Sequence, residues 1–290
     1  MGDIMTLYTE QFQSNLTMVA QQKESVFTPY VTVKTGLKGE TAVAIESVGK
    51  TEVIKQNKRY RPTPLIEMEY KRRWYMHDTY DWGTAFDSLD AMQMIQDPTS
   101  QVYASAVAAF NRQKDDTIKD AIFGINKVGK DHEENEALPA ENIIKIDTAF
   151  SGDEFKSLTS NLLSADIDLD SENFTAFLGP KQLEALFNDP EYITSYYGQT
   201  VLDQGKVKPF LGYNIKVVNN LPLVEDSGSY YRLCPVFTKD AVGLGIWEDF
   251  KSFAFIDNQR MQLPRLGATF TLGATRLDNE KIRVLKIKEA

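Results

Sequence analysis

The chain has little of what most catalytic and metal sites require. It contains one cysteine, Cys234, and two histidines, His77 and His132, which are far apart in the sequence. A single cysteine excludes an intrachain disulfide, and its apolar neighbours in RLCPVF predict a buried, unreactive thiol. No HExxH, CxxC, GxSxG or GxxxxGK[ST] pattern occurs. The sequence therefore predicts no catalytic residue, no metal site and no cofactor.

Two weaker patterns also indicate structure rather than chemistry. The Gly-Leu-Gly at 243–245 is predicted to be a turn or a helix interruption. The run DIDLD at 166–170 has the acid count of a calcium loop but lacks its glycine and its distal glutamate. A hydrolase acting through the carboxylates of 131–141 or 166–170 remains an alternative, although neither cluster has a recognisable nucleophile or base.

Long apolar runs are also absent. No run approaches the ~20 residues that a bilayer-spanning helix needs, and the first residues lack the basic start and apolar centre of a secretory signal. The charged fraction of 25% and hydrophobic fraction of 42% are typical of a globular protein. With 290 residues the chain can bury a sizeable core in one large or two ordinary domains, and we expect no membrane association.

Positive charge is scarce except in one segment. The formal net charge is −9, which argues against a general nucleic-acid binder. Residues 50–73 nevertheless carry a net charge of +5, which leaves −14 on the rest of the chain. We call this segment the basic strip. Its cations are Lys50, Lys55, Lys58, Arg59, Arg61, Lys71, Arg72 and Arg73.

The basic strip has three possible uses. It could bind nucleic acid, because aromatic residues such as Tyr60 and Trp74 are interleaved with the cations and could stack on bases. It could be a solvated face whose charges protect an exposed strand edge from aggregation. It could also contact the acidic remainder of a neighbouring copy. The polar ribbon in which it lies has little core of its own, and this favours the third use.

One long helix is predicted over residues 97–124. Asp97 can accept hydrogen bonds from the first turn, Pro98 suits the first helical position, and Gly124 offers a left-handed turn at the end. An apolar stripe runs along it, formed by Val102, Ala106, Phe110, Thr117 and Ala121 and widened by Tyr103, Val107, Ile118 and Ile122. A charged belt lies elsewhere on the helix, formed by Arg112, Lys114, Asp115, Asp116, Lys119 and Asp120.

Period-two alternation predicts strands on both sides of this helix. Residues 30–76 read as a polar ribbon of two or three strands, which is barely stable alone and which we expect another subunit to support. Residues 126–144 read as an acidic, turn-rich surface loop. Residues 151–250 alternate strands and helices as an α/β unit that a capping box opens at Ser151–Glu154. The segments FAFIDN, GATFTLGATRL and KIRVLKIKEA read as antiparallel strands.

These parts, taken together, resemble a known family. The stretch from TPLIEMEYKRRWYM through DPTSQVYASAVAAFNRQKDDTIKDAIFG, at residues 63–124, and the ending GATRLDNEKIRVLKIKE are similar to major capsid proteins of tailed bacteriophages with the HK97-type fold. The resemblance implies an α+β fold with an N-terminal arm, an extended β-hairpin loop, a spine helix in a peripheral domain and an α/β axial domain. The implied ranges are 1–33 for the arm, 34–84 for the extended loop, 85–150 and 251–290 for the peripheral domain, and 151–250 for the axial domain.

The resemblance also implies a function without catalysis. The chain would be a structural subunit of an icosahedral head that forms pentamers and hexamers, with the extended loop lying across a neighbour and the basic strip as an inter-subunit contact. The shell would enclose double-stranded DNA without sequence-specific binding, with a separate scaffolding protein and a portal as partners. It would be the virion capsid, assembled in the host cytoplasm. The alternatives are a nanocompartment (encapsulin-like) shell around a protein cargo, and a nucleic-acid-binding protein that uses residues 50–73.

Overall fold

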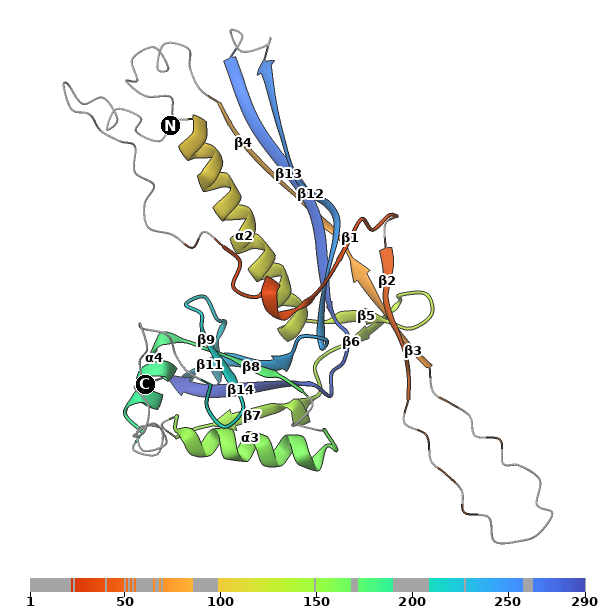
Figure 1. Ribbon diagram of the computed structural model, residues 1–290, viewed down its shortest axis with the longest axis vertical. Coiled ribbons are helices and arrows are strands. Elements are labelled where there is room, and N and C mark those ends of the chain that lie inside the picture. Colours follow the sequence, from red (N-terminus) through yellow and green to blue (C-terminus); the bar gives the residue numbers. More distant parts are fainter. Residues whose placement is uncertain are drawn as a thin grey trace.

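The molecule is elongated, with a long helix and a sheet of long strands at one end and a second sheet at the other (Figure 1). It is a computed structural model. The structure describes residues 22, 24–39, 41–49, 51, 53, 55, 65, 68, 70–85, 99–148, 150–167, 172–189, 209–226, 228–257 and 263–289. A two-stranded ribbon, β2 and β3, leaves the side of the molecule between these two parts. One continuous cluster of buried apolar side chains runs through both sheets.

Helix α2 (Thr99–Phe123) is the predicted spine helix. Its 25 residues make it roughly 38 Å long at about 1.5 Å per residue. Phe110, Ile118 and Ile122 are buried in the main core, and the ring of Phe110 meets that of Phe270 edge-on at 4.3 Å. The apolar stripe of the helix therefore lies against the long sheet. Among the described residues, no helix is long and apolar enough to cross a membrane.

The ends of α2 differ from the prediction. Asp97 and Pro98 lie outside the described residues, and Gly124 does not adopt a positive φ. A glycine is needed at position 124 for a steric reason instead, because a methyl group there would overlap the carbonyl oxygen of Asp120. The amide of Asn126 donates to the carbonyl of Ala121 at 2.8 Å and satisfies one terminal acceptor. The left-handed turn predicted at Gly124 is therefore wrong, because contacts from later residues end the helix.

The long sheet has the order β1-β12-β13-β4, and these strands lie alongside α2 (Figure 1). Its strands are β1 (Thr32–Thr35), β12 (Val242–Asp257), β13 (Leu263–Arg276) and β4 (Asp78–Ala85). Strand β1 is parallel to β12, and the other pairs are antiparallel. Strand β12 is a single element of 16 residues, where the sequence suggested two segments.

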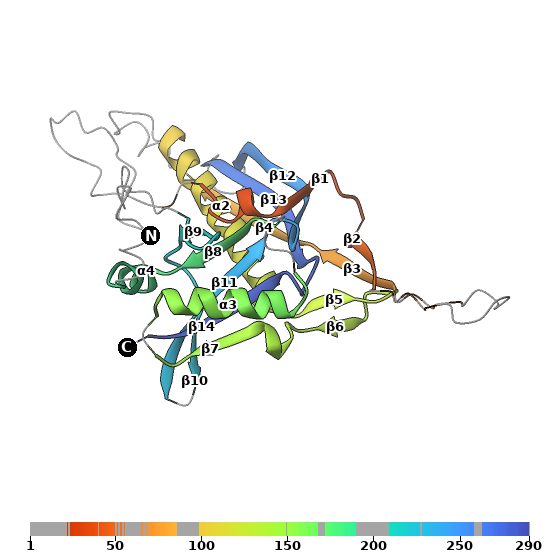
Figure 2. The ribbon, with the colours of Figure 1, turned by 60° about the horizontal axis from the view of Figure 1, so that its bottom comes forward.

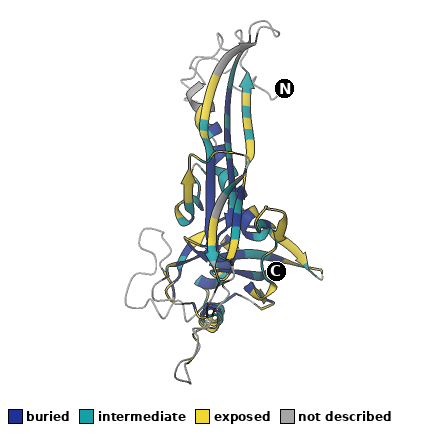
Figure 3. Ribbon diagram, turned by 90° about the vertical axis from the view of Figure 1, so that its right-hand side faces the viewer, coloured by how far each residue is buried: buried dark blue, intermediate teal, exposed yellow. Residues whose placement is uncertain are grey.

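The two faces of the long sheet differ in polarity, as the alternation of side chains requires. On the helix side, the rings of Tyr80 and Phe270 lie 5.2 Å apart. The neighbouring pair, Thr79 and Thr271, points to the other side, where their hydroxyls are 3.0 Å apart and exposed. Figure 3 shows the long strands of this sheet side by side, with buried and exposed segments along them. One face therefore belongs to the core, and Thr79 and Thr271 are exposed on the other.

The second sheet contains the predicted α/β unit. Its path is β7-β14-β11-β8-β9, and β10 pairs with β11. The strands are β7 (Ile143–Ile146), β14 (Ile282–Glu289), β11 (Ser229–Thr238), β8 (Phe174–Leu178), β9 (Asn214–Val217) and β10 (Leu223–Asp226). Helices α3 (Gly152–Ser164) and α4 (Pro180–Phe187) belong to this part, and α3 buries Phe155, Leu158 and Leu162.

The sheets do not follow the predicted ranges. Strands β7 and β14 come from 85–150 and 251–290, yet both lie in the sheet of the α/β unit. The first half of β12 comes from 151–250 and lies in the long sheet, together with β1, from the range predicted as ribbon (30–76), and β4, most of which comes from the predicted extended loop (34–84). The predicted limits at 150 and 250 therefore do not coincide with the limits between the two sheets. The chain crosses from the second sheet to the long sheet between β11 and β12, and it crosses back between β13 and β14.

The start of α3 is also capped differently from the prediction. Ser151 occupies the N-cap position, but its side chain makes no capping bond. The backbone N–H of Gly152 donates instead to the carboxylate of Asp189, at 2.5 Å. The predicted capping box therefore locates the helix start correctly but names the wrong acceptor. Pro180 stands at the first position of α4, as predicted.

The N-terminal segment is anchored by a residue of the predicted charged belt. Asp115 of α2 is buried, and its carboxylate accepts hydrogen bonds from the backbone N–H groups of Val26 and Phe27 at 3.0 and 3.1 Å. These N–H groups stand just before the short 3₁₀ helix η2 (Thr28–Tyr30). The ring of Phe27 stacks on Phe177 of β8 at 4.4 Å. Asp115 is therefore an internal acceptor and does not belong to a solvated belt.

A third, smaller sheet has the order β2-β3-β5-β6. Its strands are β2 (Thr41–Val48), β3 (Tyr70–Met76), β5 (Asn126–Val128) and β6 (Glu134–Glu136). A 3₁₀ helix, η3 (Ala140–Asn142), follows β6 and leads into β7. In Figure 2 the four strands extend together to one side of the body.

The turn before β9 gives the first testable prediction. Leu211 and Gly212 have φ values of 48° and 84°, and the bonds between Phe210 and Tyr213 close the turn. A left-handed conformation costs most L-residues ~1–2 kcal/mol, and asparagine tolerates it better than leucine. We expect Leu211→Asn to raise the free energy of unfolding by about 1 kcal/mol in chemical denaturation. Gly212→Ala is the control and should lower it, so a loss of stability in both variants contradicts the argument.

Candidate inter-subunit surface

The structure describes four of the eight cations of the basic strip: Lys55, Lys71, Arg72 and Arg73. The other four lie outside the described residues, namely Lys50, Lys58, Arg59 and Arg61. Lys55 and Lys71 are exposed, and Arg72 is partly exposed.

The ribbon that carries the strip is an antiparallel pair. Strand β2 pairs with β3 from Thr41↔Met76 to Val48↔Tyr70. Arg72 forms an ion pair with Glu46, the residue opposite it in the ladder. Its guanidinium carbon also lies 5.6 Å from the centroid of the Trp74 ring. A cation and an acid directly opposite each other favour this register over its alternatives.

Arg73 does not belong to an exposed strip. Its side chain is buried, with the residue only 5% exposed, and one guanidinium nitrogen lies 2.6 Å from a carboxylate oxygen of Glu136. A second nitrogen donates to the backbone carbonyl of Arg276 at 3.3 Å. Arg73 was predicted as an inter-subunit contact, and it is used inside its own chain instead. We therefore remove it from the set of proposed contacts.

The predicted acidic loop at 126–144 is the reason for this difference. It contains a β-hairpin, β5–β6, that pairs with β3 at Arg73↔Val128. The indole N–H of Trp74 donates to the carbonyl of Gly129 at 2.8 Å, and the backbone N–H of Gly129 donates to the backbone carbonyl of Arg72 at 3.0 Å. The prediction of a simple surface loop is therefore wrong. Part of the acidic charge that the strip was expected to meet on a neighbour is supplied by the same chain.

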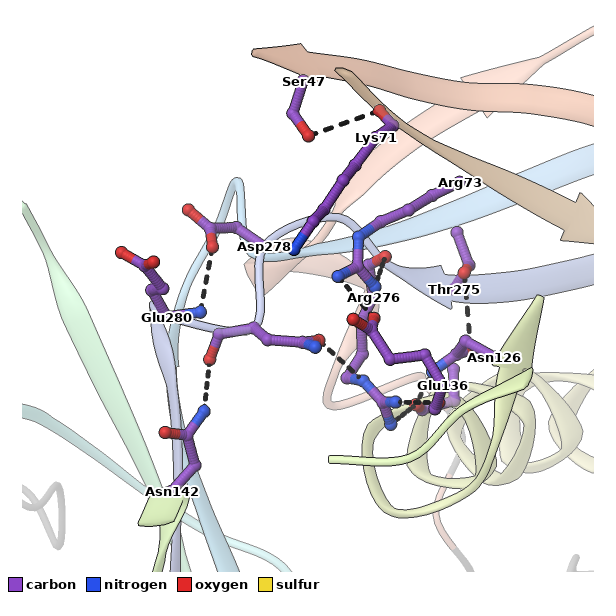
Figure 4. A network of polar contacts seen from close by, with 12 residues as sticks. Ser47, Lys71, Arg73, Asn126, Glu136, Asn142, Thr275, Arg276, Asp278 and Glu280 are labelled. Atoms are coloured by element: carbon purple, nitrogen blue, oxygen red, sulfur yellow. Dashed lines mark hydrogen bonds and ion pairs between the residues drawn. The ribbon is translucent and has the colours of Figure 1, made fainter. Parts of the chain in front are cut away.

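A buried arginine holds this junction together, as Figure 4 shows. Arg276, at the end of β13, is 0% exposed. It donates to the carbonyls of Ala121, Ile122 and Gly124 at 3.1, 3.1 and 2.6 Å, and so closes the C-terminus of α2. It also donates to the carbonyl of Glu136 at 2.7 Å.

The environment of Arg276 is costly for a positive charge. Burial and, to a lesser extent, the charge of nearby Arg73 lower the pKa of its guanidinium to about 10, although the charge of Glu136 opposes the shift. The side chain of Asn279 accepts another of its hydrogen bonds at 3.0 Å. Arg276 therefore stays charged near neutral pH. No pattern in the sequence indicates this role, because an arginine at the end of an alternating strand usually lies in solvent.

Beyond the junction, the ribbon exposes apolar side chains. Val53 and Leu65 are 97% and 98% exposed, and Tyr70 is 71% exposed. Charged and apolar side chains are thus both exposed on β3, at Lys71 and Tyr70, and in the segment before it, at Lys55, Val53 and Leu65. Exposed apolar surface of this kind marks a surface that a partner covers.

The cysteine and the two histidines pack against other side chains. Cys234 is buried, and burial raises the pKa of its thiol to about 12, so it is not a nucleophile at neutral pH. His77 and His132 pack against the rings of Trp247 and Trp74 at 5.1 and 5.5 Å. No group of metal-ligating side chains occurs in the described part of the chain. Of the acidic run 166–170, residues 168–170 lie outside it.

The Gly-Leu-Gly at 243–245 lies inside strand β12. The predicted turn or helix interruption is therefore wrong. The two glycines face the ring of Tyr75 at close range.

The architecture matches solved phage capsids over nearly its whole length. The capsid protein of Cyanophage P-SCSP1u gives a TM-score of 0.74 at 18% sequence identity, covering 98% of this chain and 94% of the other. The capsid protein of Cyanophage Pam1 gives 0.73 at 12% identity, with 100% of both chains covered. A solved chain from Mycobacterium phage Che8 gives a TM-score of 0.65 at 15% identity, covering 96% of this chain and 97% of the other. The chain thus has the α+β, HK97-type fold of phage shell proteins, as predicted.

A sequence profile described as "Phage capsid protein" matches residues 4–289. The chain belongs to this phage capsid protein family. No curated protein sequence matches it. The chain is accordingly a structural subunit of a phage head, and it forms the capsid shell of the virion together with other copies.

The junction gives the second prediction. Arg276→Lys keeps the charge but cannot reach all five acceptors, because a lysine ammonium has three donors on one atom. Several buried carbonyls would be left unpaired at a cost of about 1–3 kcal/mol each. We expect the free energy of unfolding to fall by about 3 kcal/mol or more in chemical denaturation. Arg72→Lys, at a partly exposed ion pair, is the matched control and should change it by less than about 1 kcal/mol. Equal effects would contradict a structural role for Arg276.

Proposed function

We propose that copies of this chain assemble into pentamers and hexamers that close an icosahedral head around double-stranded DNA. The observation that carries the proposal is the β2–β3 ribbon, which leaves the body of the subunit, together with the exposed Val53 and Leu65 in the segment that joins its two strands. A ribbon without its own core is barely stable in water. A neighbouring copy supplies the missing surface when the ribbon lies across it.

This contact is heterologous, since one surface of a subunit meets a different surface of the next. Repeated around an axis, such a contact closes into a ring, and rings that share edges close into a shell. The exposed cations of the ribbon, Lys55 and Arg72 among them, help to set the register on an acidic neighbour. The N-terminal arm (1–33) adds a further contact.

The proposed role needs no catalysis. With a net charge of −9, the subunit holds DNA mainly by enclosing it, because tight binding to phosphates requires many cations. A separate scaffolding protein and a portal are the assembly partners that we expect, and assembly takes place in the host cytoplasm.

The third prediction concerns assembly itself. Electron microscopy of the purified protein, with its scaffolding protein co-expressed, should show closed particles or five- and six-membered rings. A subunit that stays monomeric under these conditions contradicts the proposal. The same preparation separates the alternative of a nanocompartment, in which a protein cargo and no DNA would be found inside the particles.

The fourth prediction tests the basic strip. Lys55→Glu combined with Arg72→Glu places two negative charges where cations would meet an acidic neighbour. We expect the subunit concentration needed for assembly to rise roughly fivefold, which corresponds to about 1 kcal/mol for an exposed ion pair. The matched control is Lys288→Glu, which reverses an exposed cation at the end of β14. Unchanged assembly of the double variant would exclude a contact role for the strip.

Direct nucleic-acid binding by the strip is less favoured. Arg72 and Arg73 pair with Glu46 and Glu136 of their own chain, which leaves fewer cations for phosphates. Steeply salt-dependent DNA binding by the unassembled subunit would be the result that supports it.

A further inference from the structure

One aromatic side chain of the ribbon packs directly on the long sheet. Tyr75, near the end of β3, is fully buried and lies against β12. A methyl group on Gly243 would lie 3.0 Å from the ring carbon that bears the hydroxyl, and closer still to the hydroxyl oxygen. A methyl group on Gly245 would lie 3.1 Å from the ring at its other end. The two glycines are two residues apart, so they face the same side of β12 and together make room for the ring.

The neighbouring strand continues this surface. Gly273 of β13 is the partner of Gly245 in the ladder. A methyl group on Gly273 would lie 2.6 Å from the carbonyl carbon of Met76, so the backbone of β3 passes directly over this position. Gly243, Gly245 and Gly273 thus form a flat floor without side chains across two strands. We call it the glycine floor.

The sides of this contact are closed by other residues. Tyr75 forms a small apolar cluster with Leu277, and Leu37, Ala42 and Trp247 pack against it. The indole N–H of Trp247 donates to the carbonyl of Gly39 at 2.7 Å, which holds the start of the ribbon beside the same strand.

The hydroxyl of Tyr75 contributes nothing evident to this contact. It is buried and has no hydrogen-bond partner among the described residues, and burial raises its pKa to about 12. A buried polar atom without a partner is unfavourable. The packing of the ring on the glycine floor, and not the hydroxyl, therefore explains why these positions lack side chains.

We propose that Tyr75 on the glycine floor fixes the direction of the β2–β3 ribbon in the free subunit, and that this preorganisation lowers the subunit concentration needed for assembly. The proposal rests on the proposed function, in which the ribbon lies across a neighbouring copy. A ribbon that already points correctly loses less conformational freedom on binding than one that swings freely. Tyr75 is thus a positioning residue that acts inside its own chain.

The fifth prediction tests the direction of the ribbon first. Spin labels on Tyr70→Cys, in the ribbon, and Lys239→Cys, on the body, report one distance in the unassembled subunit. Both positions are exposed, while the native Cys234 is buried. We expect one narrow distance distribution in the parent protein and a broad one after Gly243→Ala, which forces the ring off the floor. An unchanged distribution would overturn the proposal.

Assembly is measured on the same variants without labels. We expect Gly243→Ala to raise the subunit concentration needed for assembly about tenfold. In the double variant Gly243→Ala with Tyr75→Phe, this concentration should fall part of the way back, because the second change removes the hydroxyl oxygen that lies nearest to the added methyl group. Gly83→Ala is the matched control: it adds a methyl group on β4 that meets only ordinary contact, at 3.7 Å. A broad distribution with unchanged assembly would overturn the proposed benefit of preorganisation.

A second variant covers the case in which Gly243→Ala does not fold. Tyr75→Leu removes the ring and leaves the floor empty without forcing atoms together, and it should give the same broad distribution and weaker assembly. Different results would contradict the proposed function and the proposed role of Tyr75. If the parent subunit does not assemble even with its scaffold, the proposed function fails, whereas the distance measurement still decides whether Tyr75 sets the ribbon's direction.

Discussion

A charged group that is completely removed from water constrains the whole junction of this molecule. A buried guanidinium is tolerable only when its donors all find acceptors. Arg276 meets this requirement by collecting carbonyls from the end of α2, from β6 and from the turn after β13. The positive charge also lies where the helix dipole is negative. Three features therefore depend on one another: the position of the spine helix, the hairpin β5–β6, and the segment in which the chain passes from β13 to β14.

This junction also shows that some charges of the basic strip and of the acidic segment pair within one subunit. The basic strip and the acidic segment after α2 look like complementary surfaces of two different copies. The structure places part of each together in one subunit, where Arg73 and Glu136 form an ion pair beside the buried arginine. Charge near the base of the ribbon therefore serves the fold. Only the charge farther along it, of which Lys55 is an example, remains for a partner.

The sequence predicted the elements whose signals are local. The apolar period of α2, the proline that starts α4 and the alternation in β13 and β14 are all short-range patterns, and they appear within a few residues of the expected limits. The resemblance to phage capsid proteins gave the fold class and the structural role, which the family match and the solved capsids confirm.

What the sequence did not predict depends on partners far along the chain. Gly124 and Ser151 were assigned local capping roles that Arg276 and Asp189 perform instead. Asp115 looked like surface charge because nothing near it in the sequence shows that residues 26 and 27 bring their N–H groups to it. The glycines at 243–245 looked like a turn, because their contact lies in a strand from the first third of the chain. Local patterns cannot show such contacts.

The glycine floor has a consequence for the order of events during folding. The floor is made by β12 and β13, which form a hairpin of neighbouring strands, whereas the ribbon belongs to an early part of the chain. Strand β1, which leads into the ribbon, must also find its parallel partner in β12. Pairings between such distant segments form slowly. A chain whose later strands have not yet folded has no floor on which to orient its ribbon, so the ability to join a shell comes last and distinguishes finished subunits from unfinished ones.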